Sequence, residues 1–180
     1  MRSKQLGSAL AIFDALAADG YAEAYVEIGN ILEQRDDRDG GVDLDAARSW
    51  YMRAIEEIDD PEGYIGLARL ALNGYRDAGS TDDAIEYLNI AARANRPVAL
   101  IILGTLYDAG KVIPRDINQA VDFYMKAIAT GYILPLLYLS KIELERRHYF
   151  KFLRLRMTAF RQARKIALVD RHDPRLWNVL

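Results

Sequence analysis

The sequence has 180 residues, of which 51% are hydrophobic, 28% are charged and none is cysteine. This length and apolar content suffice for a single domain over residues 1–180 with a substantial core, and the lack of cysteine excludes disulfides and thiolate metal sites. The net charge of −2 hides an uneven distribution, because residues 1–145 carry 14 basic and 24 acidic residues while residues 146–180 carry 10 basic and 2 acidic ones.

The first predicted element is a helix over residues 5–20. Its apolar stretch follows two basic residues and superficially resembles a secretion signal. Asp14 interrupts the stretch, however, and Ala9 occupies the register that Ala120 occupies later in the chain. We therefore interpret it as the second helix of an incomplete first repeat. Because no run approaches the roughly 18 apolar residues of a membrane span and no clear signal peptide is present, the sequence favours a cytoplasmic location.

Three copies of a two-helix pattern follow, at residues 21–60, 61–96 and 97–132, before a degenerate terminal repeat and basic helix at residues 133–180. The middle of each predicted first helix holds a small residue, at separations of 39, 36 and 36: Gly29, Ala68, Gly104 and Ser140. The second helices carry small residues seven positions apart with a large apolar residue between them: Ala47 and Ala54, Ala84 and Ala91, Ala120 and Ala127. This spacing defines one helix face on which a neighbouring backbone can approach closely. Such copies cannot bury their apolar stripes alone, so the sequence predicts an all-α, α/α superhelical solenoid.

Polar residues and prolines mark the predicted helix starts. Pro61 and Pro97 lie 36 residues apart at the starts of two first helices, where proline is well tolerated. The second helices open at side chains that can cap them: Asp43, Ser80 and Asp116. Ser80 and Asp116 are each followed three residues later by an acidic or amide side chain, which is typical of a capping box. We assign these polar residues to capping rather than to catalysis.

The third copy resembles the Sel1-like repeat through Tyr107, Gly110, Ile113-Pro114, Asp116, Ala120, Phe123-Tyr124, Lys126-Ala127 and Gly131. The first copy agrees at Gly29, Gly41-Val42, Asp45, Ala47, Trp50-Tyr51 and Ala54, and the second is the most degenerate, with Ala68 in place of the helix glycine. The resemblance covers about residues 9–140. It implies a tetratricopeptide-like superhelix with no shared catalytic residues. It also implies a non-enzymatic interaction scaffold or adaptor, of bacterial origin, in a signalling, secretion or polysaccharide-related assembly.

Candidate partner-binding residues follow from the expectation that first helices line the concave side of such a superhelix. The non-core positions of these helices are Glu27, Asn30, Glu33, Arg69, Leu72, Ile102, Thr105 and Asp108. A shallow arc of so few repeats suits a peptide or a helix better than a small molecule in a deep pocket. The alternative is that these residues are a solvated surface without a partner.

Residues 136–173 contain no glycine or proline, which predicts one long helix or two tightly joined ones, with a basic helix in place of the expected hairpin. Its basic residues follow one another at helical spacing: Arg147, Lys151, Arg154, Arg161 and Lys165. Apolar residues lie on another face: Tyr149, Leu153, Met157, Phe160 and Ala167. Three interpretations remain open. The apolar side caps the last repeat, or the helix binds an acidic protein surface, including that of a second copy, or it lies on anionic lipid.

The sequence predicts neither an enzyme nor a cofactor or metal site. It has two histidines and no glycine-rich phosphate loop, and the acidic run from Asp36 to Asp45 lacks the spacing of a calcium loop. Nucleic acid is not expected as a partner, because the body of the chain is acidic and carries no recognised nucleic-acid motif.

Overall fold

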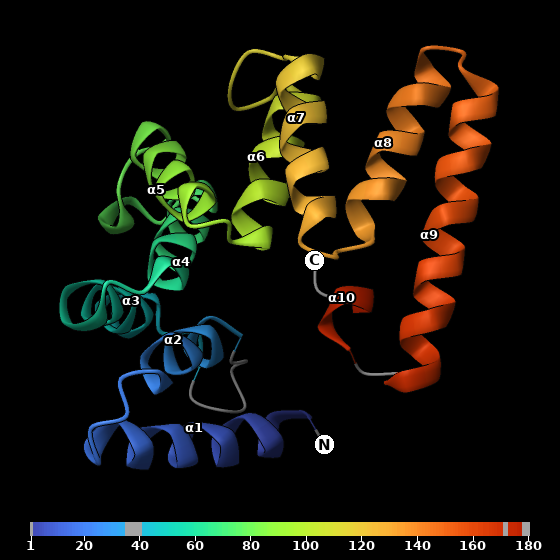
Figure 1. Ribbon diagram of the computed structural model, residues 1–180. Helices are drawn as coiled ribbons and strands as arrows, with labels where there is room; N and C mark the ends of the chain where they lie inside the picture. The colour runs from blue at the N-terminus through green and yellow to red at the C-terminus, as the bar shows by residue number, and fades with distance from the viewer. Residues whose placement is uncertain (1, 35–40, 171–172, 178–180) are drawn as a thin grey trace. The chain divides into compact units, whose positions relative to one another are not determined.

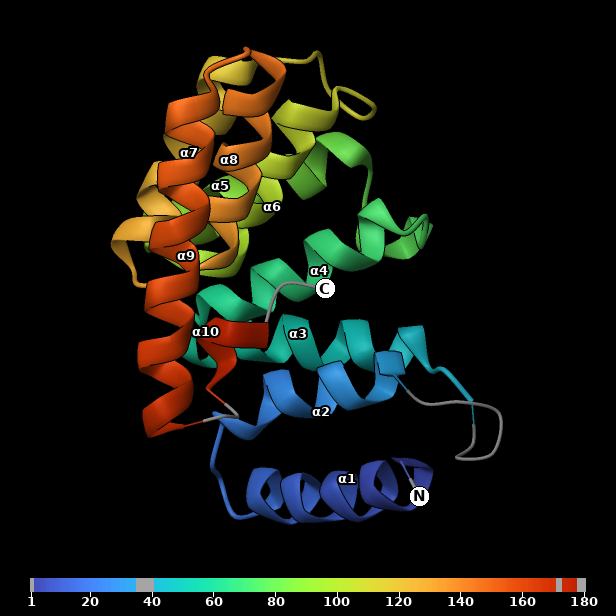
Figure 2. The ribbon, with the colours of Figure 1, turned by 90° about the vertical axis from the view of Figure 1, so that its right-hand side faces the viewer.

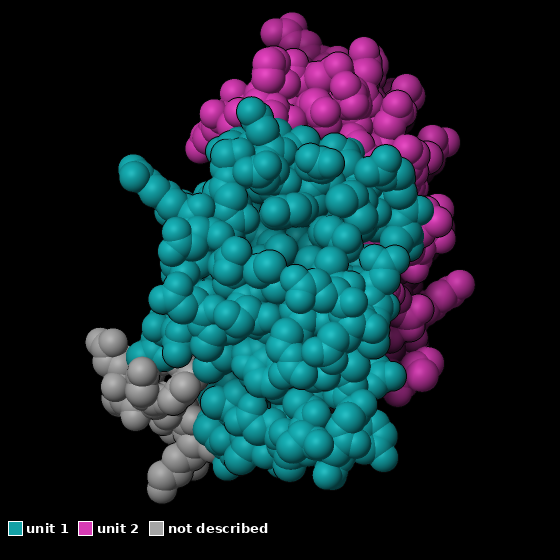
Figure 3. Space-filling view, turned by 90° about the vertical axis from the view of Figure 1, so that its left-hand side faces the viewer, with its two compact units in different colours: residues 1–94 teal, residues 95–180 magenta. Residues whose placement is uncertain are grey.

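The structure is a computed structural model that describes residues 2–34, 41–170 and 173–177. The regular elements of these residues are all helices. Contacts between Cα atoms divide the chain into two compact units, residues 1–94 and residues 95–180, coloured separately in Figure 3. The central part of the acidic run, residues 36–39, lies outside the described residues.

The first unit contains the helices α1 (Arg2–Ala18), α2 (Ala24–Gln34), α3 (Leu44–Ile58), α4 (Pro61–Leu72) and α5 (Thr81–Arg93), with a short 3₁₀ helix at Arg76–Ala78. Each of these α-helices packs against the next one along the chain. Figure 2 shows α1, α2 and α3 lying side by side, with α4 following α3. Pairs of sequential helices therefore build this unit, as stacked hairpins do.

The second unit contains α6 (Pro97–Ala109), α7 (Ile117–Ala129), α8 (Leu134–Glu145), α9 (Tyr149–Val169) and α10 (Pro174–Trp177). Helices α6 to α9 again pack in sequence, and Figure 1 shows α8 and α9 as antiparallel neighbours. The turn between them passes through Arg147, whose φ of 60° gives the reversal without glycine. Of the two alternatives predicted for residues 136–173, the structure has two tightly joined helices. The expectation that a basic helix replaces the last hairpin is wrong, because α8 and α9 form one.

The predicted caps are present at the second helices. The Asp43 carboxylate accepts the N–H of Ala46 at 2.9 Å, and Ser80 and Asp83 form a reciprocal capping box at the start of α5. Asp116 accepts two backbone N–H groups of α7. These contacts satisfy amide groups that the first turn of a helix leaves without a partner.

The core includes the predicted faces of the second helices, together with apolar residues of the first helices such as Ile28, Ile65 and Leu103. The small and large residues of the second helices are 0% exposed in every copy: Ala47, Tyr51 and Ala54 in α3, Ala84, Leu88 and Ala91 in α5, Ala120, Tyr124 and Ala127 in α7. The Tyr51 ring lies between two glycines, since a Cβ added to Gly29 or Gly66 would approach its ring atoms to 2.5 or 2.6 Å. Gly104 packs against Tyr124 in the same way, at 2.5 Å. The glycines thus allow helices to approach closely over a buried tyrosine.

Candidate functional site

A polar cluster joins α2, α3 and α4 in the first unit. The Arg69 guanidinium donates to Asn30 Oδ1 at 2.7 Å, to the Tyr51 hydroxyl at 2.9 Å and to Glu33 Oε2 at 2.9 Å. The Tyr51 hydroxyl in turn donates to Asn30 Oδ1 at 3.0 Å. Three residues predicted to line the partner-binding surface, Asn30, Glu33 and Arg69, are therefore brought together, and with Tyr51 they hold three helices to one another.

Burial governs the electrostatics of this cluster. The side chain of Glu33 is 13% exposed, and this burial raises the pKa of Glu33, although the charge and hydrogen bond of Arg69 oppose the rise. Burial also raises the pKa of the Tyr51 hydroxyl, again opposed by Arg69. The guanidinium thus offsets part of the cost of burying both groups, whose pKa values stay raised.

A cleft of about 450 Å³ lies in the second unit. Side chains from three helices and the loop between α6 and α7 line it: Thr105, Asp108, Ala109, Arg115, Tyr124, Tyr138 and Lys141. It brings together two of the predicted residues, Thr105 and Asp108. Tyr124 was predicted only as core, yet its fully buried hydroxyl finds no hydrogen-bond partner in the described part of the chain. Lys141 was missed, although its position just after Ser140 corresponds to that of Arg69 after Ala68.

The two cations at the rim of this cleft, Arg115 and Lys141, both lie close to the carboxylate of Glu145. Arg115 Nη2 lies 3.1 Å from Glu145 Oε2 and 3.5 Å from Asp108 Oδ1, and Arg115 Nε donates to the Asp108 carbonyl at 2.9 Å. Lys141 Nζ lies 3.9 Å from Glu145 Oε1. Both cations therefore interact with Glu145, and the four groups together carry no formal net charge.

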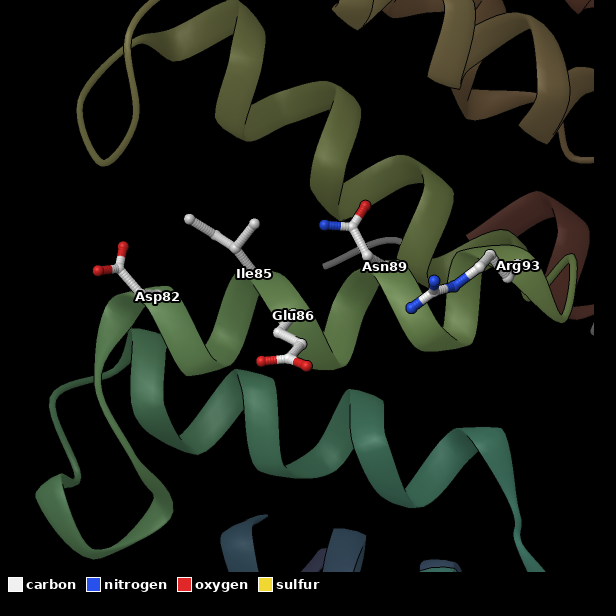
Figure 4. A pocket seen from close by; sticks show the side chains of 5 residues that line it. All are labelled: Asp82, Ile85, Glu86, Asn89 and Arg93. Carbon is white, nitrogen blue, oxygen red and sulfur yellow. The ribbon is translucent and has the colours of Figure 1, made fainter.

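Of the remaining predicted residues of the first helices, Glu27 is exposed on α2, and Leu72 on α4 and Ile102 on α6 are half-buried. A second surface pocket has all its lining residues on α5, and Figure 4 shows them spread along that helix: Asp82, Ile85, Glu86, Asn89 and Arg93. Within the described ranges no three His, Cys, Asp or Glu residues are grouped to hold a metal ion. No helix of those ranges has the length and apolarity needed to cross a bilayer.

Helix α9 carries the predicted basic residues, and its sequence has six basic residues and no acidic one. Lys151, Arg154, Arg161 and Lys165 are all exposed, as is Arg147 in the turn before the helix. The side that packs consists of Ala159, 3% exposed, with Leu155, Ala163 and Ile166 around it. The apolar side expected to cover the last repeat is instead largely exposed: Tyr149 59%, Leu153 54%, Met157 54% and Phe160 71%. That assignment of the packed face is wrong.

We call the opposite side of the helix the outer face of α9, formed by Phe150, Leu153, Arg154, Met157, Phe160 and Arg161. All six side chains are exposed. Large apolar groups and guanidinium groups therefore alternate on a surface that no other described residue covers.

Comparison with known proteins gives partial sequence matches. No family model matches the chain. It is 36% identical over 76 residues to the alginate biosynthesis protein AlgK of Azotobacter vinelandii and 37% identical over 78 residues to that of Pseudomonas syringae pv. tomato. Each match covers 42% of this chain and 16% of the relative, so the chain spans less than a fifth of the length of these curated proteins.

Solved structures match more of the chain. A Sel1 repeat protein from Oxalobacter formigenes superposes with a TM-score of 0.68 at 19% identity, over 95% of this chain and 76% of that one. A protective antigen of uropathogenic Escherichia coli strains, which displays an SLR fold, gives a TM-score of 0.59 at 23% identity, over 76% of this chain and 29% of its own.

Helices packed as sequential hairpins, together with this likeness to solved structures, define an all-α helical repeat fold. The chain is a protein of the Sel1-like repeat (SLR) fold, distantly related in sequence to AlgK. The predicted fold class and the resemblance to Sel1-like repeats are confirmed.

Proposed function

We propose that this chain is a non-enzymatic protein–protein interaction scaffold, and that the outer face of α9 binds an acidic surface of a partner protein. The observation that carries the proposal is the exposure of aromatic side chains on a basic helix. Phe150 is 92% exposed and Phe160 is 71% exposed, although α9 packs against α8 through its other side.

The composition of this face suits protein recognition. Contiguous exposed apolar groups mark interaction sites on soluble proteins, and aromatic and arginine side chains supply much of the energy at interface hot spots. The six basic residues of α9 would attract an acidic partner and speed its encounter. Such a partner could be another protein or the acidic body of a second copy of this chain.

The relatives support a role in a larger bacterial assembly. The matched proteins are named for alginate biosynthesis, so we favour a polysaccharide-related assembly over a signalling or secretion one. The chain would serve there by holding components together, as repeat scaffolds do.

The test is affinity capture from native bacterial lysate with the full chain and with a variant of the outer face, Arg154→Gln with Arg161→Gln and Phe160→Ser. A matched control replaces two exposed cations elsewhere, Lys111→Gln with Lys126→Gln. We expect the outer-face variant to lose a partner that the control keeps, with unchanged helix content. Equal capture by both variants would contradict the proposal. Light scattering of the purified chain identifies the case in which the partner is a second copy.

Anionic lipid is a second candidate, because exposed phenylalanines beside cations also suit the surface of a membrane. Vesicles of phosphatidylcholine with and without phosphatidylglycerol distinguish it. A peripheral membrane role predicts sedimentation only with the anionic vesicles and its loss in the outer-face variant. Sedimentation that survives these substitutions, or none at all, would exclude lipid binding through α9.

A further inference from the structure

The repeat register relates the polar cluster of the first unit to the cleft of the second. Counting from the small residue of each first helix pairs Asn30 with Thr105, Glu33 with Asp108 and Arg69 with Lys141. Counting from the second-helix residues Ala47 and Ala120 pairs Tyr51 with Tyr124. Both arrangements thus have a tyrosine from a second helix, a carboxylate four residues after the helix glycine, and a basic residue on the following first helix.

The two tyrosines are placed alike. A Cβ on Gly29 would lie 2.5 Å from Cε1 of Tyr51, and a Cβ on Gly104 would lie 2.5 Å from Cε1 of Tyr124. Both side chains are 0% exposed. They differ at the hydroxyl, since that of Tyr51 contacts Arg69 at 2.9 Å whereas that of Tyr124 is without a partner among the described residues. A buried hydroxyl without a hydrogen bond is unfavourable, so a hydrogen-bonding group placed at this hydroxyl would gain free energy from it.

In the first unit, the group that donates to the corresponding tyrosine hydroxyl is the guanidinium of Arg69. Lys141 occupies the equivalent position, but its side chain is 64% exposed and its ammonium lies by Glu145 at 3.9 Å. The cleft of about 450 Å³ lies beside Tyr124. Because the Tyr124 hydroxyl is buried, an incoming side chain reaches it only by displacing a neighbour such as Tyr138, whose ring stacks on that of Tyr124 at 5.2 Å.

The walls of the cleft offer acceptors. The side chain of Asp108 is 11% exposed, and its Oδ1 lies 3.5 Å from Nη2 of the more exposed Arg115. Thr105 donates its hydroxyl proton to the Ile102 carbonyl at 2.7 Å, which leaves the lone pairs of its oxygen to accept. The Tyr124 hydroxyl can accept as Tyr51 does from Arg69.

Asp108 is the formal charge that acts on the Tyr124 hydroxyl, whereas the cations that also line the cleft, Arg115 and Lys141, both interact with Glu145. Burial raises the pKa of Tyr124, and the nearby charge of Asp108 raises it further, whereas at Tyr51 the charge of Arg69 acts in the opposite direction. A cation placed by the Tyr124 hydroxyl would therefore gain from Asp108, and a carboxylate would be repelled by it.

We propose that this cleft binds an arginine side chain of a partner protein, which would contact Asp108, Thr105 and Tyr124 as Arg69 contacts its own cluster. A planar guanidinium has five N–H donors in fixed directions, which suits three acceptors from two helices better than the compact ammonium of lysine does. The inference rests on the proposed scaffold function but uses a surface other than the outer face of α9. It gives the chain a second binding specificity.

The direct test titrates the full chain with the blocked tripeptide acetyl-Ala-Arg-Ala-amide and follows the Thr105 amide and the Tyr124 ring by NMR. We expect saturable shifts at both residues. The same peptide with neutral citrulline should bind at least about tenfold more weakly, because charge-assisted hydrogen bonds are the stronger ones. No saturable shift with the arginine peptide, or equal affinity for citrulline, would overturn the inference.

Variants of the cleft sharpen the test. Lys141→Arg would supply the guanidinium from within the chain, so it should abolish peptide binding, whereas Lys141→Met should preserve it. Tyr124→Phe should weaken it. Arginine-peptide affinity that is unchanged in both Lys141→Arg and Tyr124→Phe would contradict the site. Arg154→Gln, on α9, should leave peptide binding unaltered. A negative peptide result together with α9-dependent capture would reject this inference and leave the proposed scaffold function standing.

Discussion

Arg69 Nη2 donates a hydrogen bond of 2.9 Å to the hydroxyl of Tyr51. The later tyrosine at the same register position, Tyr124, is buried equally deeply but its hydroxyl has no partner in the described parts of the chain. The same packing position therefore carries a satisfied polar group in one unit and an unsatisfied one in the other. This difference gives opposite expectations for the same substitution.

Removing the two hydroxyls should change stability in different directions. Tyr51→Phe takes an acceptor from Arg69 and should lower the free energy of unfolding by about 0.5–1.5 kcal/mol. Tyr124→Phe removes a buried hydroxyl without a partner and should leave the free energy of unfolding unchanged or raise it. Urea unfolding of both variants, followed by circular dichroism, measures the difference. Equal destabilisation would show that the Tyr124 hydroxyl is bonded in solution.

Alanine at two helix glycines should also have opposite effects. In Gly29→Ala the new Cβ would lie 2.5 Å from the Tyr51 ring, so we expect a loss of about 1–3 kcal/mol from overpacking. Gly7 lies in α1 with nothing within 4 Å of its Cβ position, so Gly7→Ala should gain about 0.5–1 kcal/mol from helix propensity. Thermal unfolding of the two variants tests the pair. A neutral Gly29→Ala would mean that α2 and α3 do not approach closely there.

The packing of the repeats could be predicted because it is periodic. Ala47, Tyr51 and Ala54 lie on one face of their helix whatever the tertiary structure is, because their spacing alone determines it. Each later copy repeats that spacing. The caps could be predicted for a related reason, since Asp43 and Ser80 bond to backbone groups within three residues of themselves. Both features depend on local geometry.

The polar cluster could not be predicted in the same way. Arg69 meets Glu33 and Asn30 across 36 and 39 residues, and nothing in the register shows whether an exposed position will bend its side chain toward a neighbour or into solvent. The contact of Gly66 with Tyr51 was not predicted either, because the repeat register aligns Ala68, two residues later, with Gly29. Long-range side-chain contacts need coordinates.

The packed face of α9 was misassigned because this helix is apolar on two sides. Leu155 and Ala159 lie on the side toward α8, and Leu153 and Met157 recur at the same spacing on the other. Helical periodicity identifies an apolar face of a helix, but when a helix has two such faces it does not show which one packs against the protein. The choice depends on the shape of α8.

The pH dependence of stability should show the burial of Glu33. The pKa of Glu33 in the folded protein is raised above the ordinary value of 4.5, mainly because the carboxyl group is buried. The folded chain therefore binds the carboxyl proton of Glu33 more tightly than the unfolded chain does. Lowering the pH through the interval between the raised pKa and 4.5 should therefore stabilise the wild type relative to Glu33→Gln. Above that interval the difference should be constant. Urea unfolding of both proteins from pH 7 to pH 4.5 gives the difference between their free energies of unfolding at each pH. The contributions of the other carboxylates are the same in both proteins and drop out of this difference.

A difference that stays flat, or that falls as the pH is lowered, would contradict the burial of Glu33. Arg69→Met provides a further check, because removing the opposing charge should raise the pKa of Glu33 more and move the onset of the change to higher pH.

Substitutions on the two sides of α9 should have unequal costs. Ala159 is 3% exposed against α8, so Ala159→Leu should overpack this contact and cost about 1–3 kcal/mol. Met157 is 54% exposed, and Met157→Ala should change the free energy of unfolding by less than about 0.5 kcal/mol, as exposed substitutions generally do. Urea unfolding of the two variants compares them directly. If Met157→Ala were the costly one, the outer face of α9 would be packed within the protein and could not serve as the surface that binds a partner.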